Sequence, residues 1–301
     1  MKLVTYRRQD GYESVGVFNE ELNGPYDLIR AIEIYATAGN YCIPLAVDML
    51  DMLDTGMFEG NLLREVDDFV YSHKLLEELS DADDYELLAP IARPRTIYAI
   101  GRNYPAHARE SGLEVADEPT VFLKASTAVI GPEKDVVYKK WLTRVDPEAE
   151  LAVIIGKEGS NISEESASEY IAGYTILNDV TARDIQKKDL DNAQPWFRSK
   201  GIDTFCPMGP WIVLNDEITH PIELDVEMRV NGEIRQQDNT RSLAFSVPFL
   251  ISWISRYVTL YPGDVISTGT PEGMKPVVPG DVMEAYVEGI GVLKSTVVAE
   301  E

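Results

Sequence analysis

Residues 145–156 read VDPEAELAVIIG, a stretch in which acidic residues give way to an almost continuous apolar run. The run after Glu150 predicts a strand that enters the core. Side chains two residues apart on a strand point to the same face, so Glu148 and Glu150 are expected to lie side by side. Two adjacent carboxylates repel each other unless one is protonated, a basic group lies close, or a divalent cation sits between them. The alternative for an isolated pair of this kind is a solvated strand end.

A third acid, Asp179, follows another apolar strand in the segment YTILNDVTARD at residues 174–184. Three carboxylates with no histidine or thiolate nearby are hard oxygen donors, which suit Mg²⁺, Mn²⁺ or Ca²⁺ better than zinc. Glu148, Glu150 and Asp179 are therefore the candidate metal ligands, and three protein ligands leave coordination positions open for a substrate. The alternatives for Asp179 alone are a helix N-cap or an ion pair with Arg183.

A second group of polar residues lies in the segment IGRNYPAHARESG at residues 100–112. Pro105 suits the first position of a helix, and Gly112 suits its end. His107 and Glu110 are three residues apart and would share one helical face, where the carboxylate can orient the imidazole and raise its basicity. This arrangement suits general base catalysis. The alternative is an exposed His–Glu pair on a surface helix.

Two further residues become candidates for the site because they are expected near the three acidic residues. Lys200 is expected in a loop before a strand, and Thr270 lies in the tight turn TGTPEG at residues 268–273. A lysine close to an acidic metal site can bind a substrate carboxylate. The alternatives are a surface charge for Lys200 and a turn hydroxyl for Thr270.

The chain after residue 92 is rich in predicted strands. Residues 224–230 alternate strictly between apolar and polar side chains, and Asn231-Gly232 favours a type I′ turn, so residues 233–236 should return as the second strand of a hairpin. Residues 247–257 are predicted to form the clearest C-terminal helix. Many strands with few intervening helices favour a strand-rich α+β fold over a doubly wound Rossmann sheet, and no GxGxxG or GxxxxGKS motif is present. Further strands are predicted at residues 96–100, 121–124, 150–155, 170–178, 210–214, 264–268 and 281–287.

Charge divides the chain unevenly. Its 301 residues include 27 Lys+Arg and 51 Asp+Glu, a formal net charge of −24, and residues 1–92 hold 19 of the acids and only 6 of the bases. Two prolines, Pro90 and Pro94, restrict the backbone at the end of this acidic part, as expected of a linker. We therefore predict a small α+β N-terminal domain at residues 1–92, with a helix at residues 26–38 and no chemistry, and a catalytic domain at residues 93–301.

The composition also excludes several classes of protein. Strong acidity disfavours nucleic acids and anionic membrane surfaces as partners. Two cysteines, Cys42 and Cys206, are too few for a disulfide framework or a multi-thiolate zinc site. The first residues lack the apolar region of a signal peptide, and no apolar run reaches the length of a membrane span. We expect a cytoplasmic protein.

Seven motifs occur in order along the chain, and together they resemble the fumarylacetoacetate hydrolase family: GRNYPAHARESG, FLKASTAVIGP, VDPEAELAVIIGK, GYTILNDVTARDIQ, RSKGIDTFCPMGP, VNGEIRQ and STGTPEGM. The match runs from about Pro90 to the C-terminus, and residues 1–92 resemble the variable N-terminal domain that many members carry. The resemblance implies a β-roll-type catalytic fold, usually a homodimer. It also implies a divalent metal held by an ExE pair and a later Asp, which correspond to Glu148, Glu150 and Asp179.

The resemblance also assigns roles to residues near the metal. His107 and Glu110 match the family's water-activating pair, and Lys200 matches its active-site lysine. Thr270 matches the threonine that contacts the substrate carboxylate, and Gln186 matches a glutamine near the metal. These assignments extend the candidate site from three ligands to a full catalytic group.

Three more positions complete the expected substrate pocket. By resemblance, Arg102 and Tyr104 flank the pocket mouth, and Lys124 is a further substrate contact. Relatives usually have proline after this lysine, whereas Ala125 follows here and loosens the loop. Pro147 stands where relatives often carry an aromatic residue, and a proline is tolerated if the strand begins there or lies at an edge.

The resemblance implies an enzyme that acts on 1,3-dicarbonyl or α-keto acids, with a hard cation that stabilises enolate charge. We expect hydrolysis of a C–C bond in an acylpyruvate-type acid, in which the His107–Glu110 pair deprotonates water and a metal-bound enolate leaves. The alternatives are decarboxylation of an oxaloacetate-like acid and keto–enol isomerisation, which need no attacking water. A non-catalytic metal-binding protein with the same fold is the alternative from another class.

Overall fold

The computed structural model describes residues 1–301, and a large mixed sheet runs through it. Eleven strands belong to this sheet, and most neighbours are antiparallel. Apart from two β-strands that branch off, their order is β3-β2-β1-β13-β11-β10-β16-β5-β6. The strands are β1 (Lys2–Arg8), β2 (Glu13–Asn19), β3 (Gly24–Asp27), β4 (Tyr85–Leu87), β5 (Ile97–Gly101), β6 (Thr120–Lys124), β7 (Val129–Ile130), β10 (Ala149–Ile155), β11 (Ile171–Asn178), β13 (Cys206–Leu214) and β16 (Val265–Ser267).

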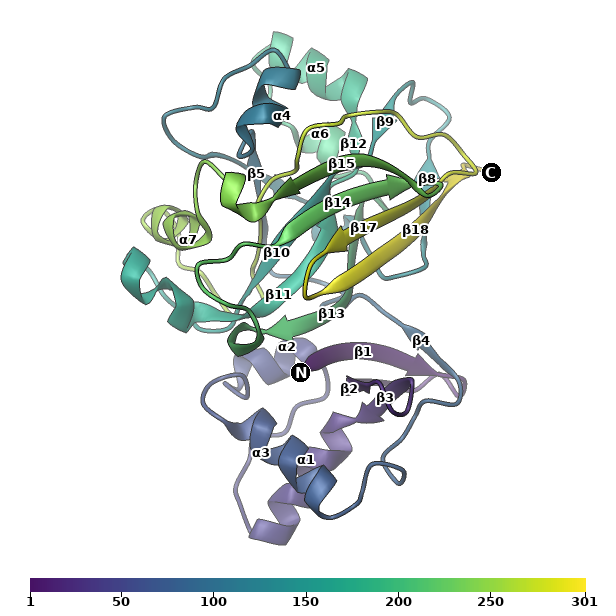
Figure 1. Cartoon of the computed structure of the whole chain (residues 1–301), viewed down its shortest axis with the longest axis vertical. Helices are drawn as coiled ribbons and strands as arrows, with labels where there is room; N and C mark the ends of the chain where they lie inside the picture. Colours follow the sequence, from purple (N-terminus) through teal and green to yellow (C-terminus); the bar gives the residue numbers. More distant parts are fainter.

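A five-stranded sheet lies beside the large one in the upper lobe of Figure 1, in the order β15-β14-β17-β18-β8. A short two-stranded ladder completes the β-structure. These remaining strands are β8 (Asp135–Tyr138), β9 (Val145–Asp146), β12 (Thr181–Ala182), β14 (Asp225–Val230), β15 (Glu233–Asn239), β17 (Val282–Val287) and β18 (Gly291–Ala299).

Helices are few and short, and they cover the ends and faces of the sheets. None of them is both long enough and apolar enough to cross a membrane. The α-helices are α1 (Leu28–Gly39), α2 (Met49–Asp54), α3 (Leu62–Ser72), α4 (Pro105–Glu110), α5 (Arg183–Asp191), α6 (Phe197–Lys200) and α7 (Val247–Ser255). The 3₁₀ helices are η1 (Ser126–Ala128), η2 (Glu164–Tyr170), η3 (Asn215–Glu217) and η4 (Thr240–Ser242), of which η2 is the longest.

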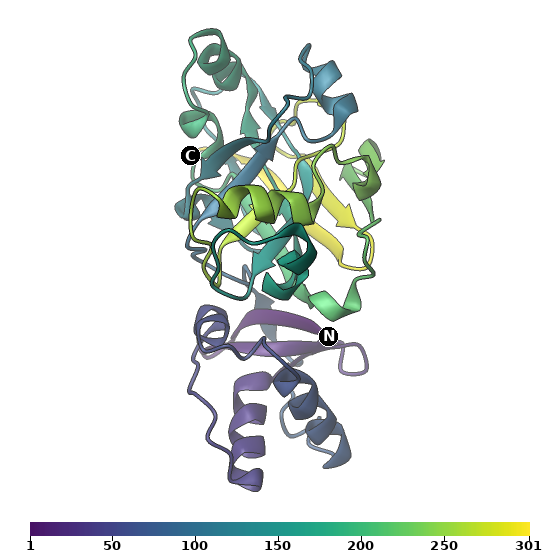
Figure 2. The ribbon, with the colours of Figure 1, turned by 90° about the vertical axis from the view of Figure 1, so that its left-hand side faces the viewer.

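The N-terminal residues form a lower lobe whose strands continue the large sheet. In β1, Leu3 pairs with Ile212 of β13, so backbone hydrogen bonds join the lobes. Figure 2 shows α1 and α3 on the side of these strands that faces away from the upper lobe. Helix α1 begins after Asp27, whose carboxylate accepts a hydrogen bond from the Arg30 backbone N–H, and ends at Asn40 in the left-handed conformation. The domain boundary near residue 92 stays a prediction.

Strand β10 lies between two hydrophobic cores, which explains why its sequence is apolar at nearly every position. Leu151, Val153 and Ile155 belong to a core of 34 buried residues in the upper lobe. Ala152 and Ile154 belong to a second core of 28 residues that extends into the lower lobe. Because both faces of β10 are covered, both sets of alternating side chains are apolar.

The strand-rich α+β class is confirmed, and the predicted strands are present. Most of their ends shift by at most one residue, but β13 begins four residues earlier and β15 ends three residues later than predicted. Asn231 and Gly232 have φ values of 53° and 79°, as a type I′ turn requires, and they join β14 to β15. Strand β10 begins at Ala149, two residues after Pro147, so this proline removes no hydrogen bond from the ladder.

Candidate active site

A cavity of about 740 Å³ lies where α4, α5 and α6 meet the start of β10, near the top of Figure 1. Its lining includes residues that follow β5 and β11 and the turn after β16. These segments are far apart in the chain, and the sheet brings their ends together. The predicted residues among its lining are Arg102, His107, Glu110, Glu148, Glu150, Asp179, Gln186, Lys200 and Thr270.

The three predicted metal ligands meet in this cavity. Glu148, Glu150 and Asp179 are each at most 3% exposed, and a carboxylate oxygen from each lies within 4.8 Å of one from the others. The pairing of β10 with β11 produces this proximity, because the Asp179 backbone N–H donates to the Glu148 carbonyl at 2.9 Å. Asn178 fixes the same junction by accepting a hydrogen bond from the Glu148 backbone N–H. The solvated strand end is therefore wrong as an interpretation of this pair.

Buried cations compensate two of the three acids. Lys200 Nζ lies 2.7 Å from Glu148 Oε2 and 2.5 Å from Asp179 Oδ2. Lys124 Nζ lies 2.6 Å from Asp179 Oδ1, and it donates a hydrogen bond to the Lys200 carbonyl. Arg183 forms an ion pair with Glu148 Oε1. Burial alone would raise the pKa of Glu148, but the positive charges of Lys200 and Arg183 hold it below its usual range.

Glu150 differs from its two neighbours because no cation pairs with it. Its Oε2 accepts hydrogen bonds from the Ser267 hydroxyl at 2.5 Å and the Gly269 backbone N–H at 3.0 Å, whereas its Oε1 accepts none. Burial and the negative charges of Asp179 and Glu148 raise the pKa of Glu150 to about 8. One carboxylate of three is thus short of positive charge, and all the donors are hard oxygens, so these residues fit a divalent cation.

His107 is buried in the cavity wall, but it is not hydrogen-bonded to Glu110. Its Nδ1 lies 3.8 Å from Glu110 Oε2 and has no hydrogen-bond partner. The two Glu110 oxygens instead accept hydrogen bonds from the backbone N–H groups of Gly273 and Met274, at 2.9 and 3.0 Å. The expectation that Glu110 orients the imidazole is therefore not met, because the turn after β16 takes both of its oxygens.

The surroundings of His107 favour its neutral form. Burial is the main cause that lowers its pKa, and the positive charges of Arg183 and Lys200 add to this effect against the nearby carboxylates. The residue is 7% exposed, so the alternative of an exposed helical His–Glu pair is also wrong. A neutral imidazole next to the acids can accept a proton at neutral pH.

Gln186, Arg102 and Thr270 line the same cavity with defined hydrogen bonds. Gln186 Oε1 accepts from Arg183 Nη1 at 2.6 Å, and Arg102 Nη2 donates to the Thr120 hydroxyl at 2.6 Å. The Thr270 hydroxyl accepts from a buried glutamine of β15. All three polar groups are thus held by the protein and can face a ligand in fixed positions.

Three predicted positions need correction. Tyr104 does not flank the pocket mouth: it is fully buried, its hydroxyl has no partner, and burial raises its pKa. Lys124 does not line the cavity and instead pairs with Asp179 from below the surface. Lys200 is the last residue of α6 rather than a loop residue, and it is buried. The alternative of a surface charge for Lys200 is wrong.

The structure also identifies residues that the sequence alone did not assign. The sequence suggests Arg183 only as a partner of Asp179, but it pairs with Asp146 and Glu148. Its place in the same motif as Asp179 was an available signal. Ser267 opens the motif STGTPEGM, but its contact with Glu150 depends on the pairing of β16 with β10, which no local pattern predicts.

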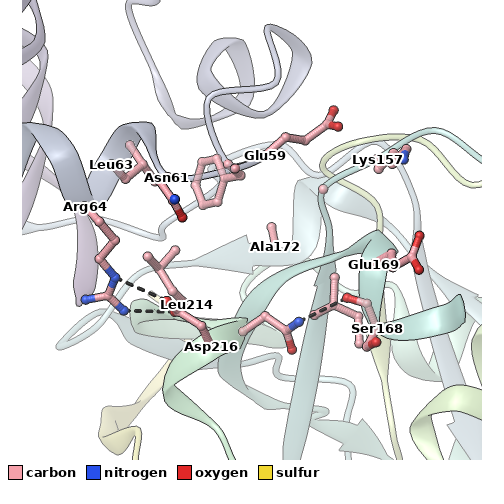
Figure 3. A pocket seen from close by; sticks show the side chains of 15 residues that line it. Glu59, Asn61, Leu63, Arg64, Lys157, Ser168, Glu169, Ala172, Leu214 and Asp216 are labelled. Carbon is pink, nitrogen blue, oxygen red and sulfur yellow. Dashed lines mark hydrogen bonds and ion pairs between the residues drawn. The ribbon is translucent and has the colours of Figure 1, made fainter.

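A second cavity, of about 350 Å³, lies between the two lobes (Figure 3). Arg64 of α3 reaches across it and pairs with Asp216 at 2.9 Å and with Glu217. Lys157 and Glu169 also line it. All of these charged groups are partly or fully exposed, and no cluster of acids converges there.

Known proteins with similar sequences and structures belong to the family that the site residues suggest. The family model described as "Fumarylacetoacetate (FAA) hydrolase C-terminal" matches residues 96–298. A mitochondrial oxaloacetate tautomerase of Xenopus laevis is 41% identical over 229 residues, covering 74% of this chain and 71% of that protein. The fumarylacetoacetate hydrolase of Exiguobacterium antarcticum superposes with a TM-score of 0.80 at 33% identity and covers 100% of both chains.

A second solved structure contains ligands. The fumarylpyruvate hydrolase of Pseudomonas aeruginosa, in complex with Mn²⁺ and pyruvate, superposes with a TM-score of 0.67 at 35% identity, covering 73% of this chain and 93% of that one. The matches span the whole predicted catalytic part, and these relatives are enzymes. The chain is therefore an enzyme that belongs to the fumarylacetoacetate hydrolase family.

Proposed function

We propose that the protein is a divalent-metal-dependent hydrolase that cleaves a C–C bond in an acylpyruvate-type keto acid. The observation that carries this proposal is the convergence of three buried carboxylates and a buried histidine in one cavity. The similarity to a fumarylpyruvate hydrolase with Mn²⁺ and pyruvate supports it.

Glu148, Glu150 and Asp179 would hold the metal, for which we propose Mg²⁺, with Mn²⁺ or Ca²⁺ as ions that suit the same donors. When bound, the cation supplies a Lewis acid that stabilises negative charge on the oxygens of the keto acid. Glu150 is the natural anchor, because its Oε1 accepts no hydrogen bond and no lysine or arginine pairs with it.

Lys200 and Thr270 prepare the cavity for an anion. Burial would lower the pKa of Lys200, but the charges of Asp179 and Glu148 raise it, so the ammonium group keeps its proton. Its positive charge favours an anionic ligand. The Thr270 hydroxyl, which lines the same cavity, offers a hydrogen bond to a carboxylate.

His107 supplies the proton transfers of the hydrolytic reaction. Its neutral imidazole takes a proton from water, and the water oxygen forms a bond to the distal carbonyl carbon of the substrate. The C–C bond then breaks, and its electron pair passes to the keto-acid fragment as an enolate. Protonated His107 returns the proton to that fragment, which gives a pyruvate-type acid and a carboxylic acid.

Keto–enol tautomerisation of an oxaloacetate-like acid is the second candidate, and the position of Glu110 favours it. A tautomerase needs one base and no activated water. His107 alone can act in this way while Glu110 is bound to the turn at Gly273 and Met274. The Xenopus relative is named for this activity.

A substrate panel separates these reactions. The full-length protein is assayed with acylpyruvates, with oxaloacetate and with sugar-derived keto acids, each with Mg²⁺ or with a chelator. We expect Mg²⁺-dependent release of pyruvate and a carboxylic acid in equal amounts from an acylpyruvate. Interconversion of oxaloacetate tautomers without bond cleavage would support the second candidate, and release of carbon dioxide would indicate a decarboxylase. If the protein converts none of these substrates, both proposals are contradicted.

The proposal includes an assembly and a location. The resemblance implies a homodimer, which light scattering would show as twice the chain mass of 33.6 kDa. A small keto acid is the proposed partner, with no nucleic acid or membrane. The cytoplasmic location stays a prediction, and the Xenopus relative is mitochondrial.

A further inference from the structure

Gln236 is a buried polar residue of β15 that joins the metal-site strand to the turn carrying Thr270. It is 1% exposed. Its Oε1 accepts a hydrogen bond from the Ala149 backbone N–H at 3.0 Å, between the two glutamates of the candidate metal site. Its Nε2 donates to the Thr270 hydroxyl oxygen at 2.9 Å and to the Pro271 carbonyl at 2.8 Å. The oxygen and both N–H groups of this amide are therefore engaged by the protein.

The partners fix which way the amide faces. The Ala149 N–H can only donate, and the Pro271 carbonyl can only accept, so exchanging the oxygen and nitrogen of Gln236 would oppose like groups at both contacts. Nε2 therefore faces Thr270, whose oxygen must accept. The hydrogen of the Thr270 hydroxyl is left without a protein acceptor, and this residue lines the cavity.

A β-bulge directs Gln236 toward this turn. The register between β14 and β15 shifts after Met228, which pairs with Gln236, and Arg235 is left as the extra residue. Bulges bend a strand and redirect its side chains, often beside active sites. Gly273 packs on the bulge: an added Cβ would lie 1.9 Å from the Arg235 carbonyl oxygen, and its φ is 114°. The bulge and the turn are thus held in one fixed relation.

We propose that Gln236 is a positioning residue that makes the Thr270 hydroxyl a dedicated donor toward the cavity. The inference rests on the proposed function, in which Thr270 binds a substrate carboxylate. A hydroxyl can otherwise donate or accept. With its acceptor side facing Gln236, it favours an anionic oxygen over an ammonium or amide N–H group. Gln236 therefore contributes to selection for carboxylate ligands without touching them.

The test is a double-mutant cycle on ligand binding. Oxalate binding to the full chain with saturating Mg²⁺ is measured by calorimetry for wild type, Gln236→Glu, Thr270→Val and the double variant. The introduced carboxylate still accepts a hydrogen bond from the Ala149 N–H, but it cannot donate one. It therefore accepts a hydrogen bond from the Thr270 hydroxyl, which is then no longer free to donate to the ligand. Each single change should weaken oxalate about tenfold, the worth of one hydrogen bond to a charged group.

The double variant should bind oxalate within about twofold of Thr270→Val, because Gln236 acts through the hydroxyl. The proposal would be overturned if Gln236→Glu weakened oxalate binding equally in the wild-type and the Thr270→Val proteins. Charge repulsion, or a disturbance of the strand that carries the metal ligands, would give that result. No effect of Gln236→Glu would overturn it as well. Thr270→Ser, which keeps the hydroxyl, should retain oxalate affinity and is the matched control.

Gln236→Leu is a second test variant, in case Gln236→Glu does not fold. It frees the hydroxyl rather than capturing its proton, so its effect should be smaller than that of Gln236→Glu and should vanish in the Thr270→Val background. A purely structural role predicts the reverse order, because leucine leaves the Ala149 N–H unpaired. Mg²⁺ binding without oxalate is measured for every variant to confirm an intact metal site.

The outcomes also separate this inference from the proposed function. Coupling between Gln236 and Thr270 in a protein that hydrolyses no keto acid would contradict the proposed reaction and leave the inference standing. Hydrolysis without coupling would overturn the inference alone. Failure of wild type to bind oxalate with Mg²⁺ would overturn both.

Discussion

The candidate active-site cavity and the cleft between the lobes both contain ion pairs, but the two sets differ in burial. In the candidate active site, the side chains of Lys200, Glu148 and Asp179 are 2%, 4% and 1% exposed. In the cleft, those of Arg64 and Asp216 are 35% and 62% exposed. Charges that are removed from water interact strongly and need compensation, whereas exposed pairs are screened and worth little.

Burial therefore indicates which region performs chemistry. Carboxylates that stay buried together cost free energy, and the protein offsets that cost with Lys124, Lys200 and Arg183. Glu150 is left without such a partner, and burial with its acidic neighbours raises its pKa. A perturbed group of this kind in a cavity is typical of a functional site, while the cleft has the character of a joint between lobes.

The largest expected effect is on catalysis. His107→Ala removes the proposed base and should lower kcat by about 10²- to 10⁴-fold in the steady-state assay that the substrate panel identifies. Mg²⁺ affinity should stay within about twofold of wild type, because His107 is not among the proposed ligands. An unchanged kcat would remove His107 from the mechanism. It would also contradict the claim that the buried cavity, rather than the cleft, performs the chemistry.

Metal affinity gives the next effect. Glu148→Gln removes one of three ligand charges and should weaken Mg²⁺ binding at least about 100-fold by calorimetry. Asp83→Asn, which changes an exposed acid in the lower lobe, is the matched control and should bind Mg²⁺ as wild type does. Wild-type affinity in Glu148→Gln would place the metal elsewhere.

The pH dependence of metal binding tests Glu150 directly. Because its pKa is raised to about 8, the metal-free carboxyl holds a proton at neutral pH, and a cation must displace it. Mg²⁺ affinity should rise up to about tenfold per pH unit between roughly pH 6 and 8 and level off above that range. Calorimetry in buffers of different ionisation enthalpy should show about one proton released near pH 7. Affinity that is flat over this range would contradict an uncompensated Glu150.

The smallest effect is expected in the cleft between the lobes. Arg64→Ala removes exposed ion pairs and should change the free energy of unfolding by less than about 1 kcal/mol in urea titration. Arg183→Ala, the buried counterpart, removes one of the two cationic partners of both Asp146 and Glu148, which keep Arg144 and Lys200, and should cost more than Arg64→Ala, up to about 3–5 kcal/mol. Equal costs for the two arginines would break the comparison between the regions.

Sequence patterns predicted the local structure well where one segment carries the whole signal. The alternation at residues 224–230 and the Asn231-Gly232 turn both have local causes, and both are found in β14 and its hairpin. The apolar run after Glu150 likewise predicted the strand that positions two acids. Each of these features depends on residues that are close in the chain.

Contacts between distant backbone groups could not be predicted in this way. Glu110 was expected to bind His107, but backbone N–H groups of a turn more than 160 residues away take its oxygens. Gln236 was visible in a motif, yet its role depends on a bulge at Arg235 that no periodicity reveals. The pairing of β1 with β13 also has no local signal, because any extended strand presents the same backbone groups.

The central claim is that three buried acids bind one divalent cation, and anomalous diffraction from crystals grown with Mn²⁺ tests it most directly. The account predicts a strong manganese peak within coordination distance of carboxylate oxygens from Glu148, Glu150 and Asp179. Crystals that bind manganese only at other positions, or that show no manganese near these three carboxylates, would contradict it.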